Sequence, residues 1–276
     1  MAGTFSKSNR PKRPGAYFAF QAKVAEPTLV NPQGVVALGF THSWGPENTV
    51  IPLNSFGDFL GKYGQGGTTP PTYTSGYRSV RDTFKGEGLP GYGGAGQVLG
   101  YRIVGSGGAY ATKVLQNTTP AAAITLTARY KGTYGGQITL DVVADVTDPT
   151  NKHNLVVKVE GAEAERWVYA KTNIADLVAQ INGASPYAVA NASKWVTATQ
   201  TITGVALNLV AAQALTGGND GATLVAGDFS AAQTALEPWR FSVMAFDNQV
   251  DPTILAAQVA WAKDLNSKGK RFMSVV

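Results

Sequence analysis

Alternating apolar and polar positions on either side of a glycine-rich connection form the clearest pattern in this sequence. Apolar residues share one face before the connection and one face after it: Ile124, Leu126 and Ala128, then Ile138, Leu140 and Val142. A two-residue repeat is typical of a half-buried strand, and the Gly-rich residues 131–136 are typical of a tight connection. The pattern predicts two antiparallel strands joined as a hairpin.

Shorter apolar runs bounded by Gly, Pro, Asn and Asp predict further strands along the chain. We expect them at residues 13–24, 34–40, 97–104, 154–159, 167–169, 195–199, 205–210, 241–246 and 271–276. Runs with helical spacing predict helices at residues 55–60, 76–85 and 173–183, a short one near 228, and a last one at 252–269.

Cap signals support the boundaries of these helices. Ser55, Ser75, Asn173 and Asp228 stand at expected first positions, and Asp251 precedes a proline at the start of the last helix. Glycines at 86, 183 and 269 stand at expected ends.

These elements predict a mixed α+β, multi-domain chain, in which a mixed α/β core domain carries a β-rich inserted domain and an extended N-terminal strand arm. The expected bounds are 1–25 for the arm, 26–116 for the first part of the core domain, 117–215 for the β-rich domain and 216–276 for the start of an α/β C-terminal domain. The chain ends inside a strand that reads as buried, so we expect it to be part of a longer polypeptide.

Charge is concentrated at the N-terminus. The net charge is +5, and the first thirteen residues hold four cations and no acid: Lys7, Arg10, Lys12 and Arg13. A basic arm suits nucleic acid, acidic lipid or an acidic neighbour. No basic and aromatic interleaving continues into the fold, so we expect no nucleic-acid binding. The chain has no cysteine, no signal-peptide pattern and no apolar run of membrane-spanning length, which predicts no disulfides and no membrane insertion.

Candidate catalytic or metal chemistry is weak. Residues 86–91 match G-x-G-x-x-G, but they follow a helix and include Pro90, whereas a dinucleotide site needs a strand before and a helix after. His42 and His153 lack a third ligand at a recognisable spacing. We therefore predict no enzyme, no catalytic residue, no cofactor and no metal.

Three clusters have a functional and a structural interpretation. Glu160, Glu163 and Glu165 beside Arg166 form either an acid pair for glycoside hydrolysis or a solvated hairpin end. Residues 219–221, Asn-Asp-Gly, form either a calcium ligand set or a turn. The aromatic side chains are either a sugar platform or packing residues: Trp44, Tyr63, Tyr73 and Tyr77. The structural interpretation is the more common one in each case.

Four motifs, in order, resemble the contractile phage tail sheath family. They are RPGAY at 13–17, GVVALG at 34–39 with SWGPEN at 43–48, LTARYKGTYG at 126–135, and GGNDG at 217–221. The resemblance spans residues 13–276 and implies a structural subunit that polymerises helically around a tail tube. In this family, contraction of the sleeve drives the tube through the host envelope.

The resemblance also implies partners. They are other copies of the chain, the tail tube protein, and baseplate and tail terminator proteins, in a virion tail made in the host cytoplasm. An apolar arm strand would pair with a neighbouring subunit through Pro14, Gly15, Tyr17, Phe18 and Phe20. The alternative function is a β-rich carbohydrate-binding or adhesin module of a phage or cell surface, acting through exposed aromatic residues.

Overall fold

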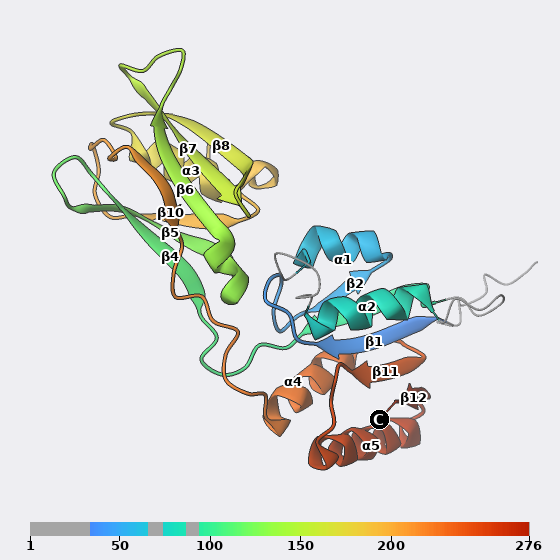
Figure 1. Cartoon of the computed structure of the whole chain (residues 1–276). Helices are drawn as coiled ribbons and strands as arrows, with labels where there is room; N and C mark the ends of the chain where they lie inside the picture. Colours follow the sequence, from blue (N-terminus) through green and yellow to red (C-terminus); the bar gives the residue numbers. More distant parts are fainter. Residues whose placement is uncertain (1–33, 66–73, 87–93, 276) are drawn as a thin grey trace, which may run out of the picture.

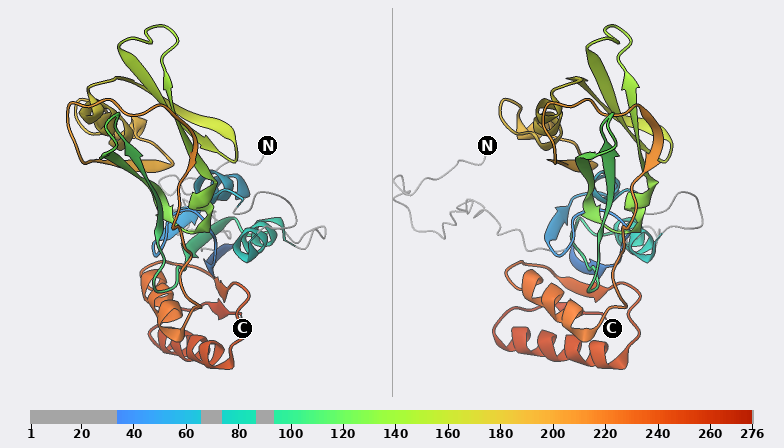
Figure 2. Two further views of the ribbon diagram at one scale, coloured as in Figure 1. Left: turned by 60° about the vertical axis from the view of Figure 1, so that its left-hand side comes forward. Right: turned by 90° about the vertical axis from the view of Figure 1, so that its left-hand side faces the viewer.

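The computed structural model describes residues 34–65, 74–86 and 94–275. They form two units, one stacked above the other and joined by two chain segments (Figures 1 and 2). The α/β unit holds a five-stranded sheet drawn from both ends of the described chain, and the β unit lies between these ends in sequence.

The sheet of the α/β unit has the order β12-β11-β1-β3-β2. Its strands are β1 (Val35–Phe40), β2 (Val50–Leu53), β3 (Gln97–Arg102), β11 (Val243–Phe246) and β12 (Met273–Ser274). All neighbours pair in parallel except β2, which runs antiparallel to β3. Residues from the ranges 26–116 and 216–276 thus form one sheet. The domain bounds expected from the sequence stay a prediction.

Helices cover both faces of this sheet, because its strands are apolar on both sides. Helices α1 (Phe56–Tyr63) and α2 (Ser75–Lys85) pack over one face, where Leu38 and Phe40 of β1 meet Phe59 and Val80. Helices α4 (Ala226–Leu236) and α5 (Pro252–Ser267) pack over the other face. Burial of both faces fixes the sheet as the centre of the unit (Figure 1).

The β unit has two antiparallel sheets around one apolar core. One sheet has the order β4-β5-β9 and the other β10-β6-β7-β8. The strands are β4 (Tyr110–Gln116), β5 (Ala122–Lys131), β6 (Ile138–Ala144), β7 (Lys152–Val159), β8 (Ala162–Ala170), β9 (Val196–Gln200) and β10 (Val210–Ala214). Helix α3 (Ile174–Asn182) adds Ile174, Leu177 and Ile181 to this core, and a short 3₁₀ turn, η2 (Val189–Asn191), follows it.

The predicted hairpin at 124–142 is wrong. Its two strands, β5 and β6, exist but belong to different sheets, and the 3₁₀ turn η1 (Thr133–Gln137) joins them at a corner. Both strands turn their apolar faces into the same core, with Leu126 on one side and Leu140 on the other. Alternation reports a half-buried strand but not its partner, so a corner between two sheets fits the pattern as well as a hairpin does.

Most of the expected helix caps are confirmed. Asn173 accepts a hydrogen bond from the Asp176 backbone, and Asp251 accepts one from the Thr253 backbone with proline at the first helical position. Ser55 caps α1 as expected.

Two of the caps differ from the expectation. Thr74 rather than Ser75 caps α2. Asp228 lies inside the first turn of α4, where its carboxylate accepts a hydrogen bond from the Val225 backbone at 2.9 Å.

Candidate functional site

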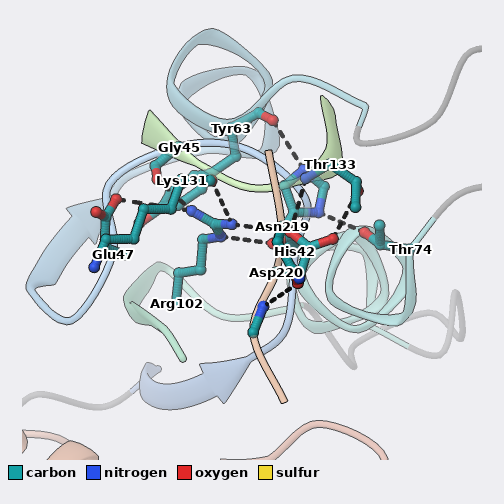
Figure 3. A network of polar contacts seen from close by, with 11 residues as sticks. His42, Gly45, Glu47, Tyr63, Thr74, Arg102, Lys131, Thr133, Asn219 and Asp220 are labelled. Carbon is teal, nitrogen blue, oxygen red and sulfur yellow. Dashed lines mark hydrogen bonds and ion pairs between the residues drawn. The ribbon is translucent and has the colours of Figure 1, made fainter. Parts of the chain in front are cut away.

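Arg102 lies at the join between the two units. It is the last residue of β3, and the chain passes from there into the β unit. Its side chain is 0% exposed, although arginine is almost never fully buried without partners. The residues around it therefore define a candidate site, which we call the Arg102 joint: His42, Gly45, Glu47, Arg102, Lys131, Thr133 and Asp220 (Figure 3).

Three backbone carbonyls receive the guanidinium group. Its Nε donates to the His42 oxygen at 2.6 Å, and Nη1 donates to the Gly45 oxygen at 2.8 Å. Its Nη2 donates to the Lys131 oxygen at 2.9 Å. The first two acceptors belong to the loop after β1, whereas Lys131 ends β5 in the β unit. One planar side chain therefore ties the α/β unit to the β unit through fixed acceptors.

Two carboxylates complete the shell. The Asp220 Oδ1 lies 3.4 Å from Nη2, and the Glu47 Oε2 lies 3.8 Å from Nη1. Asp220 also accepts from the Thr133 hydroxyl at 2.6 Å, and Glu47 accepts from the Tyr110 hydroxyl at 3.1 Å. Through Thr133 and Tyr110, both acids are bound to the β unit. They also balance the charge of Arg102, and a buried charge is kept inside a protein only when it is paired in this way.

Burial lowers the pKa of Arg102, and the charges of Asp220 and Glu47 oppose this shift. A guanidinium starts from a very high pKa and stays protonated in proteins. The side chain is therefore a permanent cation with a fixed set of acceptors, and it suits a structural role better than proton transfer.

His42 is a second buried polar side chain of the joint. Its Nε2 donates to the Tyr63 carbonyl at 2.8 Å, so Nδ1 carries the lone pair that faces the Thr74 hydroxyl. Burial lowers the pKa of His42 to about 4, and the charge of Arg102 acts in the same direction. The imidazole is neutral at neutral pH and connects the loop after β1 to α1 and α2.

Glycines let the backbones approach closely at the joint. Gly132 has a φ of 130°, and a Cβ built there would lie 2.1 Å from the Ser43 carbonyl oxygen. Gly45 has a φ of 101°, and its Cβ would lie 2.2 Å from the Tyr63 ring. Other residues would be strained at these φ angles and would also collide with their neighbours.

Trp44 forms an apolar contact beside this polar shell. It belongs to the loop after β1, yet it is 3% exposed within the core of the β unit. Its ring stacks on Trp195 at 5.5 Å, makes an edge contact with Tyr130 at 5.2 Å and packs at a tilt against Tyr134 at 5.7 Å. The α/β unit is thus anchored in the β unit by a side chain of its own loop.

The chain enters and leaves the β unit through adjacent segments. Ala109 and Asn219 exchange two backbone hydrogen bonds, of 2.9 and 3.0 Å, and Thr112 pairs with Thr216 in the same way. Asp220 therefore reaches Arg102 from the segment that returns to the α/β unit.

A hollow of about 510 Å³ opens beside the joint. Its lining includes Thr41, Ser43, Thr74 and Thr133, with Asp220 as the carboxylate. Among the described residues, no group of three His, Cys, Asp or Glu side chains is arranged to hold a metal ion, and no helix is long and apolar enough to cross a membrane. The hollow thus opens beside the contacts that couple the two units mechanically.

No family model matches the chain. Two proteins of Bacillus subtilis (strain 168) resemble almost all of it: the phage-like element PBSX protein XkdK, 26% identical over 99% of this chain, and the uncharacterized protein YqbK, 24% identical over 99%. The chain spans about half the length of these relatives, 54% in each case.

Two solved structures share the fold. A sheath tail protein from Desulfitobacterium hafniense covers 95% of this chain at a TM-score of 0.67 and 24% identity, and the chain covers 52% of it. A sheath tail protein from Listeria innocua covers 88% at a TM-score of 0.66 and 22% identity, and the chain covers 47% of it. This chain has the tail sheath fold.

Three of the four sheath-like motifs meet at the Arg102 joint. The motif at 43–48 supplies Gly45 and Glu47, the motif at 126–135 supplies Lys131 and Thr133, and the motif at 217–221 supplies Asp220. These segments are far apart in the sequence and adjacent in the fold. Residues 219–221 are a turn, as the structural interpretation expected, in which Asn219 accepts from the Gly221 backbone at 2.8 Å.

The remaining sheath-like motif, RPGAY at 13–17, and the predicted arm that contains it lie outside the described residues. This holds for Pro14, Gly15, Tyr17, Phe18 and Phe20, so their contact with a neighbour stays a prediction. Residues 87–91 of the G-x-G-x-x-G match also lie outside, and Gly86 ends α2 as expected.

Other sequence candidates are dispersed in this sheath fold. Glu163 pairs with Arg166 at 2.7 Å, whereas Glu160 accepts from the Tyr134 hydroxyl and Glu165 from the Ser193 hydroxyl. Each of the three carboxylates thus has a different partner. The two histidines are also in different units, with His42 after β1 and His153 in β7.

The aromatic side chains considered for a sugar platform are packing residues where the structure describes them. Trp44 is in the core of the β unit, and Tyr63 and Tyr77 pack with α1 and α2 in the α/β unit. Tyr73 lies outside the described residues. The positions of Trp44, Tyr63 and Tyr77 therefore do not favour the carbohydrate-binding alternative.

Sequence reasoning missed Arg102. A lone arginine at the end of an apolar strand, Gln97–Arg102, carries no motif, and its partners come from three distant segments. The available signal was its position, since a cation that ends a predicted buried strand needs acceptors in the fold.

Proposed function

We propose that this chain is part of a structural subunit of a contractile tail sheath, which polymerises helically around a tail tube and shortens to drive it through the host envelope. The observation that carries the proposal is the sheath fold over 88–95% of the chain. The resemblance to a phage-like element protein supports the same assignment.

The joint gives this proposal a physical basis. A subunit that moves during contraction must keep its own shape while its contacts with neighbours change. Arg102, with all its acceptors inside the chain, and Trp44, buried across the join, hold the two units as one body. The motion would then occur between subunits and not inside the described part of one.

The arm supplies the contact between subunits in this proposal. If the segment that holds Tyr17, Phe18 and Phe20 is extended, Phe18 and Phe20 would share one face, and backbone pairing with the edge of a neighbour's sheet would keep subunits linked while their bodies turn. The role is structural and not enzymatic. The further partners would be the tube, baseplate and terminator proteins of a virion tail assembled in the host cytoplasm.

Electron microscopy of the purified chain tests the function. We expect tubes, rings or short stacks from the chain of 276 residues, and their loss on deletion of residues 1–24. Tyr17→Ser, Phe18→Ser and Phe20→Ser together should have the same effect, whereas the control Lys7→Ala with Lys12→Ala in the same arm should still assemble.

Monodisperse monomers of the unaltered chain, at high concentration and over a range of salt, would count against the function. Assembly that survives the three serine substitutions would count against the arm.

A further inference from the structure

A basic hollow lies at one end of helix α5. Its volume is about 510 Å³, and it is formed where α4 and α5 both end. Four cations, one acid and two aromatic rings line it, so its charge is positive on balance: Arg240, Lys268, Lys270, Arg271, Glu237, Trp239 and Phe241. Trp239 is 38% exposed, which is unusual for so large an apolar ring.

Two of these cations are available to a partner. Lys268 is paired with Asp264 at 2.7 Å, and Lys270 donates to the Glu237 carbonyl at 2.5 Å. Arg240 and Arg271 form no ion pair with any described residue. The hollow therefore presents two free guanidinium groups around an exposed indole, which is a surface suited to a carboxylate beside a small apolar side chain.

A loop of matching chemistry lies at the other end of α5. Residues 247–251 connect β11 to this helix, and Figure 1 shows the loop entering the end of α5 away from β12. Val250 is 82% exposed at its tip, and Asp251 is exposed beside it. We call residues 247–251 the α5 entry loop.

The α5 entry loop is held in one shape. Asp247 donates its backbone N–H to the Gly39 carbonyl at 2.8 Å, which fixes one end to β1. The backbone of Asp251 donates to the Gln249 side chain at 2.7 Å, and its carboxylate accepts from Thr253 at 2.8 Å. An exposed valine on a fixed loop loses little conformational entropy on docking.

The two surfaces cannot meet within one molecule. Helix α5 has 16 residues, so they are separated by about 24 Å of helix. A contact between different surfaces of two identical chains is heterologous, and it continues from copy to copy unless the ring closes. The complementary charges of Asp251 and the two arginines favour a second copy of this chain as the occupant of the hollow.

We infer that the α5 entry loop of one subunit docks in the basic hollow of the next, with Val250 against Trp239 and Asp251 beside Arg240 and Arg271. This inference rests on the proposed function, since it assigns one contact of the self-assembling subunit. It involves surfaces separate from the N-terminal arm.

Charge substitution with rescue tests the contact by analytical ultracentrifugation of the full chain. Val250→Lys puts a cation at the tip, and Arg240→Glu with Arg271→Glu reverses the hollow. Each should weaken association at least about tenfold, because like charges then face one another. A mixture of the two proteins should associate again, because the unaltered loop of the arginine variant can dock in the unaltered hollow of the Val250 variant, while the lysine tip meets the acidic hollow.

Matched controls change charge and apolarity elsewhere. Lys263→Glu alters an exposed cation of the same helix, and Val146→Lys alters a valine that is 92% exposed in the β unit. Both should associate like the unaltered chain. The inference would be overturned if the Val250 and arginine variants associated as strongly as the unaltered chain. It would also be overturned if their mixture did not recover association.

Disulfide trapping gives a second readout. The chain has no cysteine, so Val250→Cys with Lys268→Cys creates the sole thiol pair. The length of α5 prevents closure within one chain, since a disulfide needs Cα atoms less than about 7 Å apart. We expect a ladder of covalent dimers, trimers and longer species on oxidation, and dimers at most from either single variant.

The absence of a ladder would also overturn the contact. Failure of this inference and failure of the proposed function differ in outcome. If tubes form but no ladder appears, the loop contact is wrong and the proposed function stands. A ladder without tubes keeps the contact and removes the sheath role.

Discussion

Two contacts join the α/β unit to the β unit, and they differ in kind. Trp44 enters the apolar core of the β unit, whereas Arg102 is held by carbonyls and carboxylates of both units. An apolar contact tolerates small rotations because dispersion has no direction, but a planar guanidinium with fixed acceptors does not. The first provides attraction and the second fixes orientation.

Arg102→Met should give the largest effect. The substitution leaves the His42, Gly45 and Lys131 carbonyls and two carboxylates without their donor, and breaking such a buried charge set costs about 3–5 kcal/mol. Urea unfolding should record this loss. The control Lys263→Met, at an exposed position, should change stability by less than about 0.5 kcal/mol. A small effect at Arg102 would mean that the joint does not fix orientation.

Trp44→Ala should cost about 3 kcal/mol, the lower end of the range for a buried aromatic residue. The value is low because Trp44 also lines a hollow of about 300 Å³ at the rim of the core, where neighbours can relax. Trp44→Phe should recover more than half of the loss. The double variant Trp44→Ala with Arg102→Met tests whether the two contacts are independent. If its loss of unfolding free energy is smaller than the sum of the two single losses, the contacts are coupled and the distinction between them weakens.

The pH dependence of stability isolates His42. Its pKa of about 4 is below its unfolded value, so the unfolded chain binds the proton more tightly. Stability is full above pH 6.5 and falls by about 2–3 kcal/mol between pH 7 and pH 4.5. His42→Gln should flatten this slope in thermal melts at several pH values.

His153 is the internal control for that experiment. Burial also lowers the pKa of His153, so its contribution has the same sign. His153→Gln should leave most of the slope in place, because His42 has the larger shift. A slope that disappears with His153→Gln instead would assign the acid sensitivity to the β unit.

Asp220→Asn should have the smallest effect, about 1 kcal/mol. Its side chain is 40% exposed, so solvent screens its attraction to Arg102, and asparagine keeps one oxygen acceptor. Salt titration provides the check, since the difference between the two proteins should shrink at 1 M salt. A loss as large as that of Arg102→Met would show that the carboxylate, and not the carbonyl shell, holds the arginine.

Local signals were readable in the sequence, and the join was not. Asn173 and Asp251 cap their helices as predicted, because capping depends on residues two or three positions away. The order of motifs also predicted the fold. The strand that pairs with β5 could not be predicted, since alternation leaves the pairing of strands open. The burial of Arg102 could not be predicted either, because its partners lie up to 118 residues away in the sequence.

The adjacent entry and exit of the β unit have one further consequence. The backbone of Gly105 donates to Asp220 at 3.3 Å and that of Ala222 to Ser106 at 2.9 Å, so the ends of the insertion lie side by side at the α/β unit. A module with neighbouring ends can be exchanged for another without lengthening the host chain. The β unit can therefore vary in the loops far from this join while the parent sheet keeps its register, provided that the Lys131 carbonyl and the core around Trp44 are kept.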